Sequence, residues 1–192
     1  MPATATAMKV SISSDIYNSL ERLQIYIEAE GFKGYDPYDT LTSPLPFHWF
    51  TRYGQAIATQ VQKRNPFNIR PLIGIKKEYN PKGMGLLLHG YALLQQTFRD
   101  KDYSKQISYI YKWLRENKSE GFKNACWGYN FGWASPEKYL PPFAPTVVAT
   151  SFIASGIYEY YKLTNDPSAK EVLISIADFI THDLPVTETE NG

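Results

Sequence analysis

The chain has 192 residues, 43% of them hydrophobic, which is enough for one ordinary globular domain with a substantial core. Its 20 Lys and Arg residues nearly balance its 19 Asp and Glu residues, so no net field would attract nucleic acid or an acidic membrane surface. A single cysteine excludes an internal disulfide and a multi-cysteine zinc site, and no window has the length and hydropathy of a membrane span. These features predict a cytoplasmic protein with neither a nucleic-acid nor a membrane partner.

The first third of the chain predicts two helices joined by a loop. Residues 1–13 lack the basic start and apolar stretch of a signal peptide, and we expect them to form a disordered lead. Apolar residues spaced by three and four predict a helix at about 14–30. Three prolines make 35–46 a loop, and a second helix is expected at about 47–64. The inner face of this second helix is expected to carry Phe50, Ile57, Ala58 and Val61.

The remainder predicts two helical hairpins. Apolar helices at about 81–98 and 145–163 each lead through a tight turn into an amphipathic helix, at about 103–118 and 168–182 respectively. No segment alternates polar and apolar residues as a strand would. The predicted fold class is therefore all-α, with stacked antiparallel helical hairpins in a single domain over 14–192.

Two aromatic loops interrupt these helices. Each begins with Gly-Phe-Lys, at 31–33 and at 121–123, and continues into a run rich in Tyr, Trp and Phe. Aromatic rings pack helices together, and they also stack against flat ligands such as sugar rings. Both uses are open for these loops.

Five strings carry a resemblance to a known group. They are Gly34–Asp39, Asn68–Ile75, Asn80–Gly85, Trp127–Trp133 and Pro145–Thr150. Together they resemble the α/α-toroid proteins of the six-hairpin glycosidase-like superfamily, including bacterial proteins from polysaccharide-related settings. The resemblance implies inner helices around a funnel, with a saccharide held by the loops at 31–46 and 119–145. About three hairpins are present, so we expect the N-terminal part of a larger toroid, completed by further chain or within a homo-oligomer.

Three carboxylates of these loops are the candidate catalytic residues. Asp36 and Asp39 flank Tyr38, and Glu137 follows the second aromatic run. Glycosidases need two such groups, one as acid and one as base or nucleophile. Asp-Pro-Tyr-Asp is equally typical of a turn, because Asp can bond its own backbone and Pro fixes the dihedral angle.

The candidate substrate-binding residues combine aromatic faces with polar groups. They are Tyr35, Tyr38, Arg70, Trp127, Tyr129, Asn130 and Trp133. The planar fork of an arginine could clamp an anionic sugar, or it could tie loop carbonyls together. The aromatic side chains could likewise fold back into the core.

The other reactive residue types offer little. His48, His89 and His182 lack the spacing of a metal site, Cys126 is expected to be a buried inert thiol, and no metal or cofactor is predicted. The first hypothesis is glycoside hydrolysis or related acid–base chemistry on polysaccharide. The alternative is a non-catalytic glycan-binding or scaffold module. A terpene-cyclising toroid is disfavoured because the motifs Asp-Asp-x-x-Asp and Asp-x-Asp-Asp are absent from the sequence.

Overall fold

The computed structural model describes residues 14–184. These residues belong to two compact units, and the boundary in the sequence falls between Lys33 and Gly34. The first unit contains helix α1 (Ser14–Ala29), as the periodicity predicts. Its end is a Schellman motif, in which the amide of Phe32 donates to the carbonyl of Ile27 across the positive φ of Gly31. The predicted lead at 1–13 lies outside the described residues.

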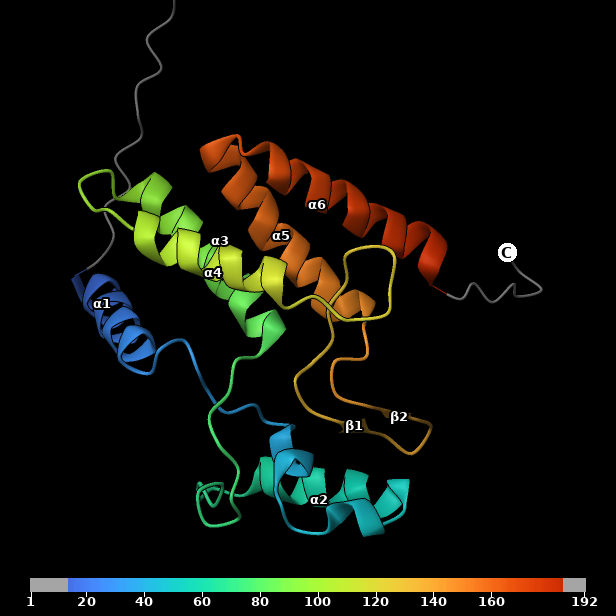
Figure 1. Cartoon of the computed structure of the whole chain (residues 1–192). Coiled ribbons are helices and arrows are strands. Elements are labelled where there is room, and N and C mark those ends of the chain that lie inside the picture. The colour runs from blue at the N-terminus through green and yellow to red at the C-terminus, as the bar shows by residue number, and fades with distance from the viewer. Residues whose placement is uncertain (1–13, 185–192) are drawn as a thin grey trace, which may run out of the picture. The chain divides into compact units, whose positions relative to one another are not determined.

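The second unit contains the helical hairpins (Figure 1). Its helices are α2 (Arg52–Arg64), α3 (Pro81–Thr97), α4 (Ser104–Glu116), α5 (Val147–Thr164) and α6 (Pro167–Asp178). Short 3-10 turns cover Asp39–Thr42 and Phe47–Trp49, and α6 continues as a π-helical turn over Phe179–Asp183. Helices α3 and α4 form one hairpin and α5 and α6 the other, which confirms the all-α class.

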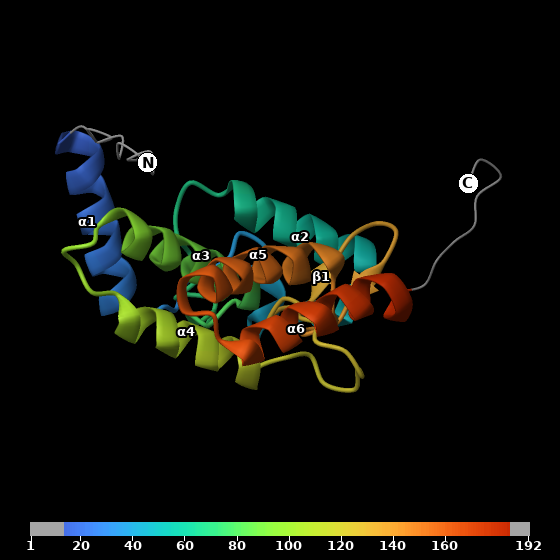
Figure 2. The ribbon, with the colours of Figure 1, turned by 90° about the horizontal axis from the view of Figure 1, so that it is seen from above.

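The two hairpins meet along α3 and α5, which run side by side in both views (Figure 2). Met84 and Leu88 from α3 are buried there together with Ile153 from α5. The two backbones come so close that a Cβ added to Gly156 would lie 2.3 Å from the carbonyl oxygen of Gly85. Glycine is thus required at this crossing.

Side-chain caps fix where these helices begin. Asn80 accepts a hydrogen bond from the amide of Gly83 at the start of α3, Thr146 does so from Ala149 at the start of α5, and Asp166 caps α6. Each cap satisfies an amide that the first helical turn leaves without a partner. Two of the capping residues, Asn80 and Thr146, also border the cavity described below.

One short hairpin departs from the prediction that no strands form. Strand β1 (Trp133–Ala134) pairs antiparallel with β2 (Tyr139–Leu140), with Trp133 opposite Leu140. Two residues per strand are too few to produce a readable alternation in the sequence. This β hairpin projects from the long segment between α4 and α5.

The predicted inner face of α2 is wrong. Ile57 and Val61 are 64% and 65% exposed, Phe50 is also exposed and Ala58 is half-buried, whereas Thr59 and Gln62 are buried. The polar face of α2 is buried because it packs against the polar loop at 34–43, which contacts Gln62 through hydrogen bonds. Within residues 14–184, no helix combines the length and apolar character needed to cross a membrane.

Candidate functional site

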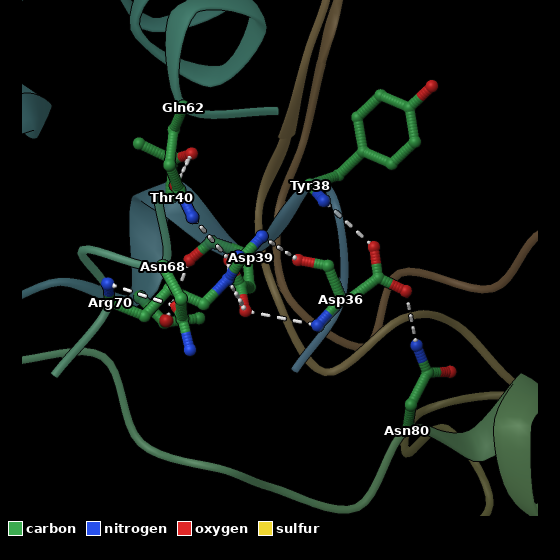
Figure 3. Close-up of polar contacts among 9 residues, drawn as sticks. Asp36, Tyr38, Asp39, Thr40, Gln62, Asn68, Arg70 and Asn80 are labelled. Carbon is green, nitrogen blue, oxygen red and sulfur yellow. Dashed lines mark hydrogen bonds and ion pairs between the residues drawn. The ribbon is translucent and has the colours of Figure 1, made fainter. Parts of the chain in front are cut away.

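A buried ion pair organises the first aromatic loop of the second unit (Figure 3). Arg70 Nε lies 2.9 Å from Asp39 Oδ1 and 3.0 Å from Oδ2, and Gln62 Nε2 donates to Oδ1 at 3.1 Å. The amide of Asp36 donates to Asp39 Oδ2 at 3.0 Å. Asp39 is 5% exposed, so its carboxylate is fully used in tying this loop to α2 and to the segment that carries Arg70.

Asp36, three residues earlier, points the other way. Its Oδ1 accepts from the amide of Tyr38 at 2.9 Å, and its Oδ2 accepts from Nδ2 of Asn80, also at 2.9 Å (Figure 3). Burial raises the pKa of this carboxyl above its ordinary value, and the nearby Asp39 charge adds to the rise, against the lowering effect of the Tyr38 amide and of Lys82. Asp36 is half-buried and borders a cavity.

That cavity, which we call the aromatic cavity, has a volume of about 810 Å³. It lies between the Asp36 loop, the start of α3, the β hairpin and the start of α5. Its aromatic lining consists of Tyr38, Tyr129, Phe131 and Trp133. Its polar lining includes Asp36, Asn80, Lys82, Lys138 and Thr146. Flat apolar faces are therefore combined with a few directional polar groups, as is typical of small-molecule sites.

Two of the rings form a stacked pair within this lining. The centroids of Tyr129 and Phe131 are 5.2 Å apart and their planes are inclined by 23°. Burial raises the pKa of the Tyr129 hydroxyl, and the Asp36 charge nearby adds to this rise. The hydroxyl is therefore a neutral hydrogen-bonding group at neutral pH, available beside Asp36.

A glycine contact holds this wall against α5. Gly128 pairs with Pro145 in an isolated antiparallel bridge, and a Cβ at Gly128 would lie 2.1 Å from the carbonyl oxygen of Ala144. The amide of Thr146 donates to the carbonyl of Trp127 at 3.0 Å. Glycine at this position thus places Tyr129 at the start of α5.

Six predicted site residues do not line the aromatic cavity: Asp39, described above, and Tyr35, Arg70, Trp127, Asn130 and Glu137. Trp127 is fully buried and donates its indole N–H to the carbonyl of Leu114 at 3.1 Å, so it is a core residue and not a stacking surface. Glu137 is exposed in the turn between the strands, where its carbonyl accepts from Arg52 at 3.2 Å. The ring of Tyr35 lies 5.5 Å from the Arg70 guanidinium.

The guanidinium of Arg70 donates to the Asp39 carboxylate and to the backbone carbonyl of Asp36. These contacts correspond to the alternative in which the arginine ties loop carbonyls together.

Asn130 borders a cavity of about 20 Å³ that Asp36 and Asn80 also line, and its amide oxygen is buried without a hydrogen-bond partner in residues 14–184. A cavity of this size suits one water molecule.

Asn80, Lys82 and Phe131 line the aromatic cavity but are not among the predicted site residues. The Asn-Pro pair at 80–81 is a helix-start signal. Residues at a helix start lie next to the loops that pack at that end of the helix. That signal could have placed Asn80 and Lys82 at the mouth of the predicted funnel. Phe131 lies inside the predicted aromatic run and differs from its neighbours only in the direction of its side chain.

The other candidate groups are structural in the described part of the chain. Burial raises the pKa of the Cys126 thiol to about 11, so this buried cysteine stays protonated at neutral pH, as expected for an inert thiol. Within residues 14–184, no group of three or more His, Cys, Asp and Glu side chains is placed to hold a metal ion.

Comparisons with known proteins add no assignment: no protein-family model matches the chain, and no curated protein or solved structure is significantly similar to it.

Proposed function

We propose that the aromatic cavity binds a saccharide. The observation that carries this proposal is the convergence of Tyr38, Tyr129 and Trp133 with the carboxylate of Asp36 in one cavity, where the buried Phe131 supports Tyr129. The axial C–H groups of a sugar ring favour aromatic faces, while its hydroxyls need directional hydrogen-bond partners. This lining offers both.

Asp36 is the residue we assign to a sugar hydroxyl. Each oxygen of a carboxylate has two lone pairs, and the Asp36 oxygens accept protein hydrogen bonds from the amide of Tyr38 and from the side chain of Asn80, one to each oxygen. The remaining lone pairs can accept from a ligand without breaking the loop. The two protein donors also hold the carboxylate in one orientation, which reduces the entropy that binding would cost.

Binding without hydrolysis is favoured over a two-carboxylate glycosidase mechanism. Among the described residues that line the aromatic cavity, Asp36 is the only carboxylate. Asp39 is held by Arg70, and Glu137 lies in the exposed turn of the β hairpin. A hydrolase of the usual kind would need a second carboxylate facing the same sugar.

A second candidate function is acid–base chemistry on the bound sugar, with Asp36 as the proton donor. Its support is the raised pKa of this carboxyl, which is characteristic of groups that donate or accept a proton in a reaction. Because both hypotheses place the sugar against Asp36, they share one binding experiment and differ in a product assay.

The binding experiment is a titration of tryptophan fluorescence with a panel of neutral and acidic mono- and oligosaccharides. We expect at least one sugar to quench the emission of wild type and of Glu137→Gln, and to have at least tenfold weaker affinity for Asp36→Asn. The two substitutions are matched carboxyl-to-amide changes, but only Asp36 faces the cavity. Absence of any response across the panel, or equal affinity for Asp36→Asn, would overturn the proposal.

Chromatography of the sugars that bind separates the two candidates. Release of a new sugar species by wild type, and its loss in Asp36→Asn, would support the acid–base candidate. Recovery of every ligand unchanged would contradict the acid–base candidate and support binding without chemistry.

A further inference from the structure

A second cavity adjoins the aromatic cavity on the side of α2. Its volume is about 830 Å³, and it lies between the exposed face of α2 and residues 133–136. Tyr38 and Trp133 line both cavities. The two cavities are therefore neighbours that share these two side chains as part of their walls, and we call the second one the α2 groove.

The two linings differ in charge. The α2 groove is bordered by Ile57 and Val61 and by uncharged polar side chains such as Gln60 and Asn65, and Arg64 is the only charged side chain among its described lining residues. The aromatic cavity has Asp36, Lys82 and Lys138 as charged groups. Charged groups are therefore concentrated in the aromatic cavity, while the α2 groove offers exposed aliphatic side chains.

Ile57 and Val61 are more than 60% exposed, although both lie on the face that borders the α2 groove. Covering such side chains with an apolar group removes their surface from water, which is favourable in proportion to the area covered. A free polar sugar gains little on this surface. The lining favours an apolar group that continues from a ligand held in the aromatic cavity.

We infer that the natural ligand is a saccharide joined to an apolar aglycone such as an alkyl, acyl or prenyl chain. The sugar occupies the aromatic cavity, and the chain passes between Tyr38 and Trp133 onto Ile57 and Val61 in the α2 groove. This inference rests on the proposed function and adds the class of ligand. The observation behind it is the pair of shared rings, Tyr38 and Trp133, which places the exposed Ile57 and Val61 beside the aromatic cavity.

The test compares the methyl and octyl glycosides of the same sugar. That sugar is the best binder of the saccharide panel; if no panel sugar binds, the comparison is made for each sugar of the panel. Affinities are measured by tryptophan fluorescence below the micelle-forming concentration. Each methylene that the groove buries is expected to raise affinity about fourfold, so the octyl glycoside should bind at least tenfold more tightly. An octyl zwitterion of equal chain length reports binding by the chain alone.

The double variant Ile57→Ser/Val61→Ser locates the effect. Serine has a helix propensity similar to that of Ile and Val, so α2 should persist. We expect the variant to lose the advantage of the octyl chain and to retain the affinity of wild type for the methyl glycoside. Ile174→Ser is the matched control, because Ile174 is 55% exposed on α6 and borders neither cavity.

The outcomes separate this inference from the proposed function. Equal affinities for methyl and octyl glycosides would overturn the inference and leave saccharide binding intact. An octyl advantage that survives in the double variant, or a dimer whose interface covers α2 and excludes the chain, would also overturn it. Binding of the octyl zwitterion with no response to any glycoside would overturn both proposals.

Discussion

Helices α5 and α2 use their faces in opposite ways. Helix α5 buries Ile153 and Ile157 against α3, while α2 buries Thr59 and Gln62 and exposes Ile57 and Val61. Helix α5 is apolar on most faces and α2 is amphipathic, yet α2 turns its apolar face outward, so an amphipathic pattern alone does not say which face turns inward. The inward face of each helix depends on the segment that it packs against. Helix α5 packs against the apolar helix α3, and α2 packs against the polar loop at 34–43.

The two helix contacts have different roles in the second unit. The contact of α3 with α5 is an apolar core in which two glycines allow the backbones to touch. The contact of α2 with the 34–43 loop is a polar network centred on Asp39, and it leaves Asp36 facing the aromatic cavity. Stability should depend on both contacts, whereas binding should depend mainly on the second.

The largest effect is expected at the ion pair of the loop. Arg70→Met leaves the buried Asp39 carboxylate without its cation, which should lower the free energy of unfolding by about 3–5 kcal/mol. Urea unfolding followed by circular dichroism measures this change. Lys112→Met breaks the exposed Lys112–Glu116 pair and should be nearly neutral. A loss for Arg70→Met as small as that of the control would show that the loop network contributes little.

A matched pair of isoleucines tests the contrast between the two helices directly. Ile153→Ala creates a cavity between α5 and α3 and should cost about 2–5 kcal/mol. Ile57→Ala on the exposed face of α2 should change stability by less than about 0.5 kcal/mol. Equal losses in thermal and urea unfolding would mean that α2 has a covered apolar face in solution.

The glycine crossing should show a smaller effect. Gly156→Ala places a methyl group against the carbonyl of Gly85 and should cost about 1–3 kcal/mol. Gly90→Ala is the control within α3, because nothing lies within 4 Å of its added Cβ and alanine favours the helix by about 0.5–1 kcal/mol. A stabilised Gly156→Ala protein would refute the close approach of the two backbones.

The smallest effect concerns pH. Because the pKa of Asp36 is raised above 3.8 in the folded protein, the folded state binds more protons than the unfolded state just above that pH. The free energy of unfolding of wild type minus that of Asp36→Asn should therefore fall as pH rises through this window. Urea midpoints measured from pH 3 to pH 7 give the difference, and an increase with pH would contradict the raised pKa.

The helices were predictable because their signals are local. Apolar spacing and the caps at Asn80, Thr146 and Asp166 lie within the segments that they define. The two short strands were not, because two residues carry no period. The face of α2 was also unpredictable, since it depends on which segment packs against α2, and the sequence does not show that the polar 34–43 loop does so.

The site was only partly predictable for the same reason. Asp36 and Asp39 are three residues apart and look equivalent in sequence, but Arg70, 31 residues from Asp39, pairs with the carboxylate of Asp39 and not with that of Asp36. Trp127 and Trp133 lie in the same aromatic run, yet the first donates to Leu114 in the core and the second lines the cavity. Roles that depend on distant contacts cannot be read from neighbouring residues.

The most direct test uses the indole N–H signals of the four tryptophans, Trp49, Trp113, Trp127 and Trp133, in ¹⁵N-labelled protein. Variants with each Trp replaced by Phe assign the signals, and a saccharide panel is then titrated. The saccharide-site account predicts that a binding sugar shifts the Trp133 signal and leaves the buried Trp127 signal in place. A panel that shifts no signal, or shifts only those of other tryptophans, would contradict a saccharide site in the aromatic cavity.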